Sequence, residues 1–387
     1  MSKTVENLLS LACAGVQGLK PYEAGKPIEE LEREYGVSNV VKLASNENPL
    51  GTSEKVREAI RKCIDDIALY PDVNAFYLKK AIAEHLSMPV STPVSVPAKK
   101  IASENITVGN GSNDVLEIIA HCFADQNAEV IYSQHAFAVY PIVTQAVGAK
   151  HVATPAKNWG HDLDAMANAI TDKTRLIFIA NPNNPTGTWL DEKSLYSFLS
   201  KVPENIIVVV DEAYHEYLDE ADYSSAVNWI GEFPNLIVTR TFSKAYGLAG
   251  LRIGYGVSHP VVTDILNRVR QPFNANSLAL AAAEVALSDT AFLEQSVKVN
   301  KSGMAQLTAA FQQMSLDYIP SVGNFVCVDV KTDGSVVYEA LLKEGVIVRP
   351  VGSYQMPDYI RVSIGSHSQN AVFISALQKV LNEMGIK

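Results

Sequence analysis

Short apolar runs alternate with helical patterns through the middle of the chain, and this alternation restricts the possible folds more than any other feature. Runs rich in β-branched residues occur at residues 106–108, 129–132, 175–180, 206–210 and 236–240. Between the first two runs, apolar residues recur at the spacing of a buried helical stripe, at Val115, Ile118, Ile119, Cys122 and Phe123. Residues 191–202 predict another helix. Strands that alternate with helices are typical of a mostly parallel sheet flanked by helices, so we expect an α/β fold.

The pattern changes from about Val261. Helical periodicity dominates as far as Met314, segments 324–330 and 346–349 favour strands, and residues 371–384 predict a final amphipathic helix. A chain of 387 residues exceeds one ordinary core. We expect a large domain at residues 50–275 and a smaller α+β domain at 276–387, with residues 1–49 forming an N-terminal arm and part of the small domain. The proline-rich segment 88–97 predicts a surface loop, to which we assign no role.

Charge and cysteine usage narrow the class of protein. The net charge is -10 without a run of basic residues, so nucleic acid and anionic membranes are not expected partners. The sequence contains no apolar run long enough to predict a membrane span. Widely spaced cysteines (Cys13, Cys63, Cys122 and Cys327) predict buried, reduced thiols in a cytoplasmic protein rather than disulfides or a metal site. The apolar segment 8–16 faintly resembles a signal peptide, but a helix or arm packed on the body is favoured.

Lys244 carries the most informative chemistry of the sequence. It follows the apolar run 236–240, and Thr241, Ser243 and Arg252 lie around it. A lysine amine can form a Schiff base with an aldehyde, provided that it is close enough and can lose its proton. The hydroxyls and the guanidinium are donors suited to a bound phosphate. Together these residues predict covalently held pyridoxal 5'-phosphate.

Two polar loops at other strand ends fit the same cofactor. Residues 109–113, Gly-Asn-Gly-Ser-Asn, follow a strand and open a helix, whose free N–H groups and dipole attract an anion. An ordinary turn with Asn or Ser capping is the alternative for this loop. Asn184 lies in the stiff loop Asn-Pro-Asn-Asn-Pro-Thr-Gly at residues 181–187, at the strand end where parallel sheets bind ligands. Its amide could hydrogen-bond the phenolic oxygen of the cofactor, and a plain turn is the alternative.

Asp211 places a carboxylate at the end of a fully apolar strand. Burying a carboxylate is costly unless it meets a positive charge. A protonated pyridine nitrogen would supply that charge, and keeping it protonated makes the ring an electron sink. Tyr214 could donate to the same phenolic oxygen as Asn184. The alternative for Asp211 is an acidic Mg²⁺ site, although the phosphate loop of such proteins is missing.

Aromatic and basic side chains supply the remaining candidates. Phe137 or Tyr140 could stack on a flat ring, or both could belong to the core. Tyr70 could reach a phosphate across a subunit interface, although its own segment favours a surface loop. Arg349 and Arg361 lie on strand-like runs and could clamp a carboxylate or a phosphate, with surface salt bridges as the alternative.

The ordered series Asn184, Asp211, Lys244 and Arg252 resembles the fold-type I pyridoxal-phosphate aminotransferases. Segments 20–27, 43–49 and 241–254 are similar to the histidinol-phosphate aminotransferases within that family. The resemblance covers nearly the whole chain, from about Leu19 to the final helix. It implies a large domain with a mostly parallel seven-stranded sheet, a smaller α+β domain and a homodimer with shared active sites.

The resemblance also implies a role for each candidate residue. Lys244 would bind the cofactor covalently and shuttle a proton, while Asp211 would pair with the ring nitrogen. Phe137 occupies the ring-stacking position, where many relatives carry tyrosine. The residues implied to bind the cofactor are Ser112, Asn113, Phe137, Asn184, Asp211, Tyr214, Thr241, Ser243, Lys244, Arg252 and, from the neighbouring subunit, Tyr70. Those implied to contact substrate are Tyr22, Asn110, Arg349 and Arg361, with Arg361 the best candidate for an anionic group.

The activity implied by the resemblance is transamination between L-glutamate and imidazole acetol phosphate, the ketone related to histidinol phosphate, in histidine biosynthesis. An aromatic amino-acid aminotransferase acting on phenylalanine or tyrosine is the first alternative, and a pyridoxal-phosphate decarboxylase is the second. A cofactor-binding regulator would need a DNA-binding segment, and the sequence shows no helix-turn-helix or basic extension. We expect small-molecule substrates and no bound metal.

Overall fold

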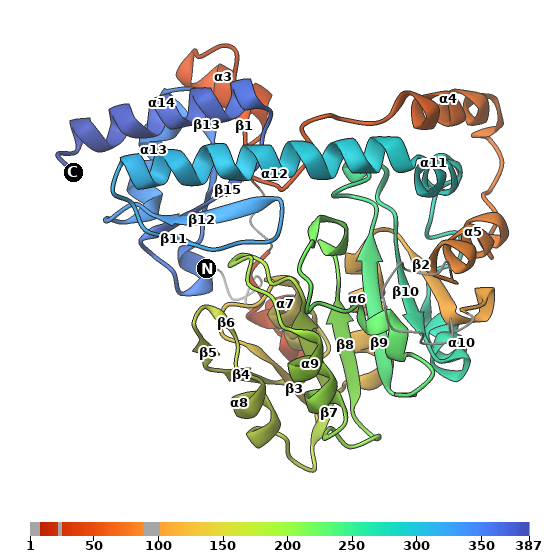
Figure 1. Ribbon diagram of the computed structural model, residues 1–387. Coiled ribbons are helices and arrows are strands. Elements are labelled where there is room, and N and C mark those ends of the chain that lie inside the picture. The colour runs from red at the N-terminus through yellow and green to blue at the C-terminus, as the bar shows by residue number, and fades with distance from the viewer. Residues whose placement is uncertain (1–7, 22–24, 88–100, 387) are drawn as a thin grey trace.

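The computed structural model describes residues 8–21, 25–87 and 101–386, and a seven-stranded sheet forms the centre of its larger part (Figure 1). The strand order is β2 (Ile106–Gly109), β10 (Gly254–Ser258), β9 (Leu236–Thr241), β8 (Ile207–Asp211), β7 (Thr174–Ala180), β3 (Glu129–Ser133) and β4 (Lys150–Thr154). Strand β10 is antiparallel to both of its neighbours, and the other pairs are parallel. The predicted α/β architecture is confirmed. The expected loop at 88–97 lies outside the described residues.

Helices cover both faces of this sheet because the strands are apolar on both sides. In β7, Ile177 and Ile179 point into one core, whereas Leu176 and Phe178 point into the other. The first core is closed by α4 (Glu54–Cys63), α5 (Phe76–Ser87), α8 (Leu163–Asn168), α9 (Glu192–Leu199) and α11 (Ser277–Ser288). The second is closed by α6 (Ser112–Phe123), α7 (Val139–Ala146) and α10 (Pro260–Val269).

The smaller part contains two further sheets. Strands β11 (Tyr318–Ile319), β12 (Phe325–Asp329), β15 (Tyr359–Ser363) and β14 (Arg349–Pro350) form an antiparallel sheet. Strand β1 (Val41–Lys42) pairs in parallel with β13 (Val346–Ile347), so the N-terminal segment enters this part of the fold. The single strand predicted at 346–349 is therefore wrong: the chain changes partner at Val348, and two short strands join different sheets.

Four helices pack around these sheets: α3 (Ile28–Tyr35), α12 (Thr290–Gln313), α13 (Gly334–Lys343) and α14 (His367–Glu383). Figure 1 shows α12 running from the end of α11 across to the smaller sheets. Alanines of α11 lie in the core of the large sheet, next to α4. The domain boundaries at 50 and 276 stay a prediction, because the long helix α12 belongs to neither part alone.

The remaining elements are short. Strands β5 (Ala156–Lys157) and β6 (Gly160–His161) form a hairpin, and α2 (Ala14–Gln17) packs closely on α7, where a Cβ at Gly15 would lie 2.0 Å from the carbonyl oxygen of Gln145. All four cysteines are free, but only Cys327 is buried and Cys13 is exposed, so the prediction of buried thiols holds for one of them. Among the described helices, none has the length and apolar character needed to span a membrane.

Candidate active site

A cavity of about 410 Å³ lies at the carboxyl ends of β7, β8 and β9, and both parts of the fold contribute to its wall. In parallel sheets this edge is the usual place for a ligand. Segment 44–46 and the small-sheet residues Arg349 and Arg361 close the opposite side. Most of the predicted site residues line this cavity: Ser112, Asn113, Phe137, Asn184, Asp211, Tyr214, Thr241, Ser243, Lys244, Arg252, Arg349 and Arg361.

A compact turn after β9 presents Lys244. The backbone N–H of Leu248 donates to the carbonyl of Phe242, which is completely buried, and Gly247 closes the turn with a φ of +70°. A Cβ at Gly247 would lie 2.1 Å from the carbonyl oxygen of Gly51. Both the positive φ and this close contact therefore require glycine. The lysine is therefore fixed at its backbone although its side chain reaches into the cavity.

The surroundings of Lys244 favour a neutral amine. Burial, followed by the positive charge of Arg361, lowers the pKa of Lys244 to about 7. Its Nζ donates a hydrogen bond of 3.0 Å to the carbonyl oxygen of Ser45 and lies 5.8 Å from the centre of the Tyr214 ring. An amine with this pKa is deprotonated in a large fraction of molecules near neutral pH, as a nucleophile or a base requires.

Asp211 ends β8 inside the cavity wall. Its carboxylate accepts hydrogen bonds from Tyr140 Oη at 2.9 Å and from Thr239 Oγ1 at 3.0 Å. Burial raises the pKa of Asp211 to about 6, and these two hydrogen bonds act in the opposite direction. The carboxylate is thus oriented by two donors, and at neutral pH it is a buried negative charge that would attract a cation.

Tyr214 is held by the N-terminal segment. Asn46 donates through Nδ2 to Tyr214 Oη at 2.9 Å, while Ser363 donates to the side-chain oxygen of Asn46 at 3.0 Å. Burial raises the pKa of Tyr214 to about 12, so its hydroxyl keeps its proton and can donate it in a hydrogen bond. Sequence reasoning missed Asn46 and also the contact of Tyr140 with Asp211. Their only signals were the polar segment 43–49 and an aromatic residue three positions after Phe137.

Arg361 joins the two parts of the fold at the cavity. Its Nη1 donates to Asn184 Oδ1 and its Nη2 to the carbonyl oxygen of Ala44, both at 2.6 Å. The guanidinium carbon lies 5.5 Å from the centre of the Phe325 ring. Its Nε is buried and has no hydrogen-bond partner among the described residues. The surface salt bridge considered as an alternative is wrong for Arg361, because the side chain is buried at the wall of the cavity.

Hydrogen-bond donors and a positive charge gather at one end of the cavity. Helix α6 begins after Gly111, which has a φ of +86° and no side chain to cap the helix, so the first-turn N–H groups stay available at Ser112 and Asn113. Arg252 lies directly against this loop: a Cβ at Gly111 would be 2.5 Å from Arg252 Nη2. Arg252 Nη1 also lies 3.4 Å from Ser243 Oγ. Backbone donors, hydroxyls and a guanidinium thus converge on one spot.

Phe137 also reaches the cavity wall, where its ring meets Tyr140 edge to face at 5.8 Å. Tyr140 itself stacks on Phe178 in the core beneath. The structure therefore separates the two aromatic candidates, because Phe137 faces the cavity and Tyr140 supports Asp211 from behind.

Two of the predicted residues that the structure describes are not brought to this cavity. Tyr70 is 82% exposed and stacks on Phe273, and Asn110 is exposed at the surface of the glycine loop. Neither lines the cavity of this chain. Tyr22 lies outside the described residues. Within the described ranges, His, Cys, Asp and Glu side chains form no group of three or more placed to hold a metal ion.

The sequence matches a known protein family over most of its length. Residues 38–377 match the family described as aminotransferase class I and II. The protein named histidinol-phosphate aminotransferase 1 of Idiomarina loihiensis is 56% identical over 374 residues, which cover 97% of this chain and 98% of that protein. The protein of the same name from Nitrosococcus oceani is 56% identical over 373 residues, covering 96% of this chain and 97% of that protein.

A solved structure is similar over the same extent. The crystal structure of histidinol-phosphate aminotransferase from Sinorhizobium meliloti in complex with pyridoxal-5'-phosphate superimposes with a TM-score of 0.85 at 28% sequence identity. The similarity covers 96% of this chain and 97% of that one. The chain described here belongs to the class I and II aminotransferases.

Proposed function

We propose that this protein is a pyridoxal-phosphate-dependent transaminase that exchanges an amino group between L-glutamate and imidazole acetol phosphate, with histidinol phosphate and 2-oxoglutarate as products. The observation that carries the proposal is the pair of relatives named histidinol-phosphate aminotransferase, 56% identical over almost their whole length. A further relative of that name from Pseudomonas fluorescens is 53% identical. The similarity extends over 96–97% of this chain.

The residues present fit pyridoxal phosphate. The glycine loop at Gly111 would admit a phosphate where a Cβ would fill the space beside Arg252. Ser112, Asn113, Thr241 and Ser243 would add donors to the same phosphate. Asp211 would hold a protonated ring nitrogen, Asn184 and Tyr214 would face the phenolic oxygen, and Phe137 would stack on the ring. Each polar atom of this cofactor thus has a chemically suited partner in the cavity wall.

When bound, the cofactor supplies an aldehyde carbon for covalent attachment and a conjugated ring that accepts the electron pair of a breaking bond. The chain supplies the proton transfer. Lys244 Nζ, with a pKa of about 7, would take the proton from the α-carbon of the amino substrate and hold it until it is returned. The hydrogen bond from Leu248 N–H to the Phe242 carbonyl and the close approach of Gly247 to Gly51 fix the turn that carries this amine.

The other residues of the cavity would orient the cofactor and the substrates and stabilise their charged groups. The negative charge of Asp211 would keep the ring nitrogen protonated, since a buried carboxylate at neutral pH favours a nearby cation. Arg361 and Arg349 would hold the carboxylate or phosphate groups of the two substrates, which are both anionic.

The assembly and location are part of this proposal. We expect a homodimer in which Tyr70 of one subunit completes the phosphate site of the other, which would explain a tyrosine that is 82% exposed in the single chain. Free cysteines are in keeping with the cytoplasm, where a biosynthetic enzyme of this kind would work.

Two measurements test the proposal. The purified protein should show a visible absorbance band that borohydride treatment removes, and Lys244→Ala should lose turnover while it keeps the fold, judged by circular dichroism. A Lys244→Ala variant with a near-normal rate would contradict the role of this lysine.

Substrate choice is tested separately, by comparing kcat/KM for histidinol phosphate, phenylalanine and tyrosine with 2-oxoglutarate as acceptor. We expect histidinol phosphate to be preferred. A preference for phenylalanine or tyrosine would instead support the aromatic aminotransferase, and release of carbon dioxide would support the decarboxylase.

A further inference from the structure

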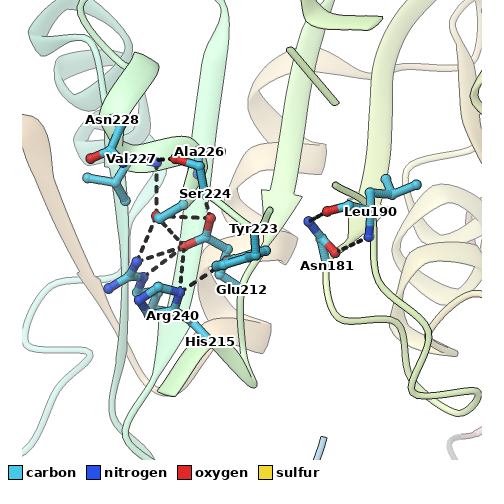
Figure 2. Close-up of polar contacts among 11 residues, drawn as sticks. Asn181, Leu190, Glu212, His215, Tyr223, Ser224, Ala226, Val227, Asn228 and Arg240 are labelled. Atoms are coloured by element: carbon cyan, nitrogen blue, oxygen red, sulfur yellow. Dashed lines mark hydrogen bonds and ion pairs between the residues drawn. The ribbon is translucent and has the colours of Figure 1, made fainter. Parts of the chain in front are cut away.

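A buried ion pair joins Glu212, the residue after the cavity residue Asp211, to Arg240 (Figure 2). Arg240 donates to Glu212 Oε2 through Nε at 3.0 Å and through Nη2 at 2.8 Å. The side chains of Arg240 and Glu212 are only 5% and 1% exposed. The catalytic role proposed above uses neither residue, and neither lines the cavity.

The position of the pair follows from the alternation of side chains along the strands. Asp211 and Thr239 meet on the cavity side of the sheet, where Thr239 Oγ1 donates to Asp211 Oδ1. The next residues, Glu212 and Arg240, point to the opposite face and meet there. The backbone N–H of Glu212 donates to the carbonyl of Thr239 at 2.8 Å. The ion pair therefore joins the same two chain segments as the Asp211 contact, from the other side.

The loop after β8 is tied to the same carboxylate. Glu212 Oε1 accepts the backbone N–H of Ala226 at 2.7 Å, and Ser225 Oγ lies 2.8 Å from both Glu212 Oε2 and Arg240 Nη2. Figure 2 shows Glu212 in the middle of this group, between Arg240 and the segment at Ala226. Both carboxylate oxygens of Glu212 accept hydrogen bonds. The donors are Arg240, Ser225 and Ala226, and together they fix the orientation of the carboxylate.

Arg240 is connected to the turn that carries Lys244. Its cross-strand partner on β10 is Tyr255, whose ring centre lies 5.7 Å from that of Phe242. Phe242 in turn packs on Tyr246 at 5.1 Å. Phe242 and Tyr246 lie two residues before and after Lys244. The turn that carries the lysine therefore packs, through these rings, on Tyr255, the cross-strand neighbour of Arg240.

We propose that the Glu212–Arg240 pair is a positioning device that holds the Asp211 carboxylate and the Lys244 turn at a fixed separation. The inference rests on the function proposed above, in which these two side chains act on opposite parts of one cofactor. Displacing reacting groups by about 1 Å can cost ~10²-fold in rate. A buried ion pair is weak evidence of stabilisation, because apolar residues of similar volume often stabilise as well or better. The contribution of the Glu212–Arg240 pair is its directional hydrogen bonds, which apolar residues cannot replace.

The first variant is Glu212→Gln, which keeps the shape of the side chain. We expect kcat to fall ~10–100-fold while KM for both substrates changes by less than about threefold, because the arginines of the small sheet are untouched. We also expect the midpoint of the pH-dependent visible absorbance of the resting protein, measured without substrate, to move from its wild-type value.

The structure offers a matched control at the other end of the sheet. Glu129 is buried at the amino end of β3, where it pairs with Lys150 at 2.8 Å and accepts a hydrogen bond from Thr171 at 2.6 Å. Glu129→Gln removes a comparable carboxylate far from the cavity. It should lower the melting temperature without changing kcat or the absorbance midpoint. An equal loss of kcat in Glu129→Gln would overturn the proposal, since the effect would then come from general destabilisation.

The double variant Glu212→Met/Arg240→Leu decides the case if Glu212→Gln folds poorly. It leaves the net charge unchanged and removes both buried charges together, so the variant should fold, with a loss of stability from the buried Ala226 N–H that loses its acceptor. Under the proposal its kcat remains low and its absorbance midpoint remains shifted, because the directional bonds are gone. Wild-type kcat and midpoint in the double variant would show that the pair serves stability alone. A wild-type protein without any visible band would instead contradict the proposed function itself.

Discussion

Burial shifts the pKa values of two cavity residues, Lys244 and Asp211, toward neutral pH from opposite directions. The pKa of Lys244 falls to about 7, and that of Asp211 rises to about 6. Both shifts have desolvation as their largest cause, which disfavours whichever form is charged. Functional sites often contain titratable groups with shifted pKa values. Burying such groups lowers the free energy of unfolding, and this loss can be measured.

The first prediction concerns this cost at Asp211. In the protein without cofactor, Asp211→Asn should raise the free energy of unfolding at pH 7.5 by up to about 3 kcal/mol, the equivalent of the raised pKa. A raised carboxyl pKa means that the folded state holds its proton more tightly. The advantage of asparagine is therefore full above pH 6, shrinks as the pH falls and is lost near pH 4. Urea unfolding at pH 7.5 and 4.5 measures it, and activity should fall at the same time.

The control for this prediction is Asp219→Asn. Asp219 is an exposed carboxylate paired with the exposed Lys301, so neither stability nor activity should change measurably. Equal stability of Asp211→Asn and wild type at pH 7.5 would show that the buried carboxylate carries no desolvation cost.

A second prediction at the residue scale concerns the fork of Arg361. Arg361→Lys keeps the positive charge but replaces the two separate Nη atoms, which contact Asn184 and Ala44, by a single nitrogen on a shorter side chain. We expect kcat/KM for both substrates to fall ~10–100-fold, since a hydrogen bond to a charged group contributes about 1.5–3 kcal/mol. Arg175→Lys, at an exposed arginine of β7, is the matched control and should behave as wild type. Unchanged kinetics in Arg361→Lys would exclude a two-point contact.

Most candidate site residues could be named from the sequence because each follows a recognisable apolar strand. Asn46 could not be named from the sequence, because its neighbours show no periodic pattern. Its role depends on contacts with Ser363 and Tyr214, which come from distant segments. The Glu212–Arg240 pair was missed for a similar reason. Two charged residues at strand ends give no sign in the sequence that they face away from the cavity and toward each other.

At the scale of elements, five strands of the large sheet were predicted to within one residue at each end, whereas the other two strands of that sheet were missed. Edge strand β4 is largely exposed and lacks an apolar run. Strand β10 contains Gly254 and Gly256, which weaken the strand pattern. Both glycines are explained by packing, since a Cβ at Gly254 would lie 2.4 Å from the backbone N of Ser112 and one at Gly256 would lie 3.0 Å from Val115.

The corresponding prediction is that Gly254→Ala displaces the start of α6. Its Cβ would also meet Arg240 O at 2.9 Å, so backbone on two sides must move. We expect a loss of about 1–3 kcal/mol in unfolding free energy. We also expect weaker binding of pyridoxal phosphate, because the N–H groups of α6 would no longer converge with Arg252. Chemical unfolding and a spectroscopic titration of the cofactor measure the two effects.

Gly250→Ala is the matched control, because a Cβ there meets no described atom within 4 Å. It should leave both quantities near their wild-type values. If Gly254→Ala bound the cofactor normally, the close approach of β10 to α6 would not be needed for the anion site.

At the scale of the whole molecule, one surface remains unexplained by the single chain. Large apolar side chains between the end of α4 and the first turn of α5 are well exposed: Ile64 50%, Ile67 62%, Leu69 69%, Tyr70 82%, Phe76 60% and Tyr77 69%. Exposed apolar patches of this kind mark interfaces. Because Tyr70 lies within the patch, covering it with a second copy would also explain why this tyrosine is far from the cavity of its own chain.

The last prediction tests that arrangement by complementation. Lys244→Ala and Tyr70→Ala should each be nearly inactive as homodimers. If Tyr70 serves the partner's cavity, a mixed dimer has one cavity in which both residues are intact. Unfolding and refolding the two variants together at equal amounts should then restore about a quarter of wild-type activity, because half of the dimers are mixed and each has one complete site. Sedimentation as a monomer, or an inactive mixture of otherwise folded dimers, would contradict a shared site. An active Tyr70→Ala homodimer would do so as well, since the tyrosine would then be dispensable in either chain.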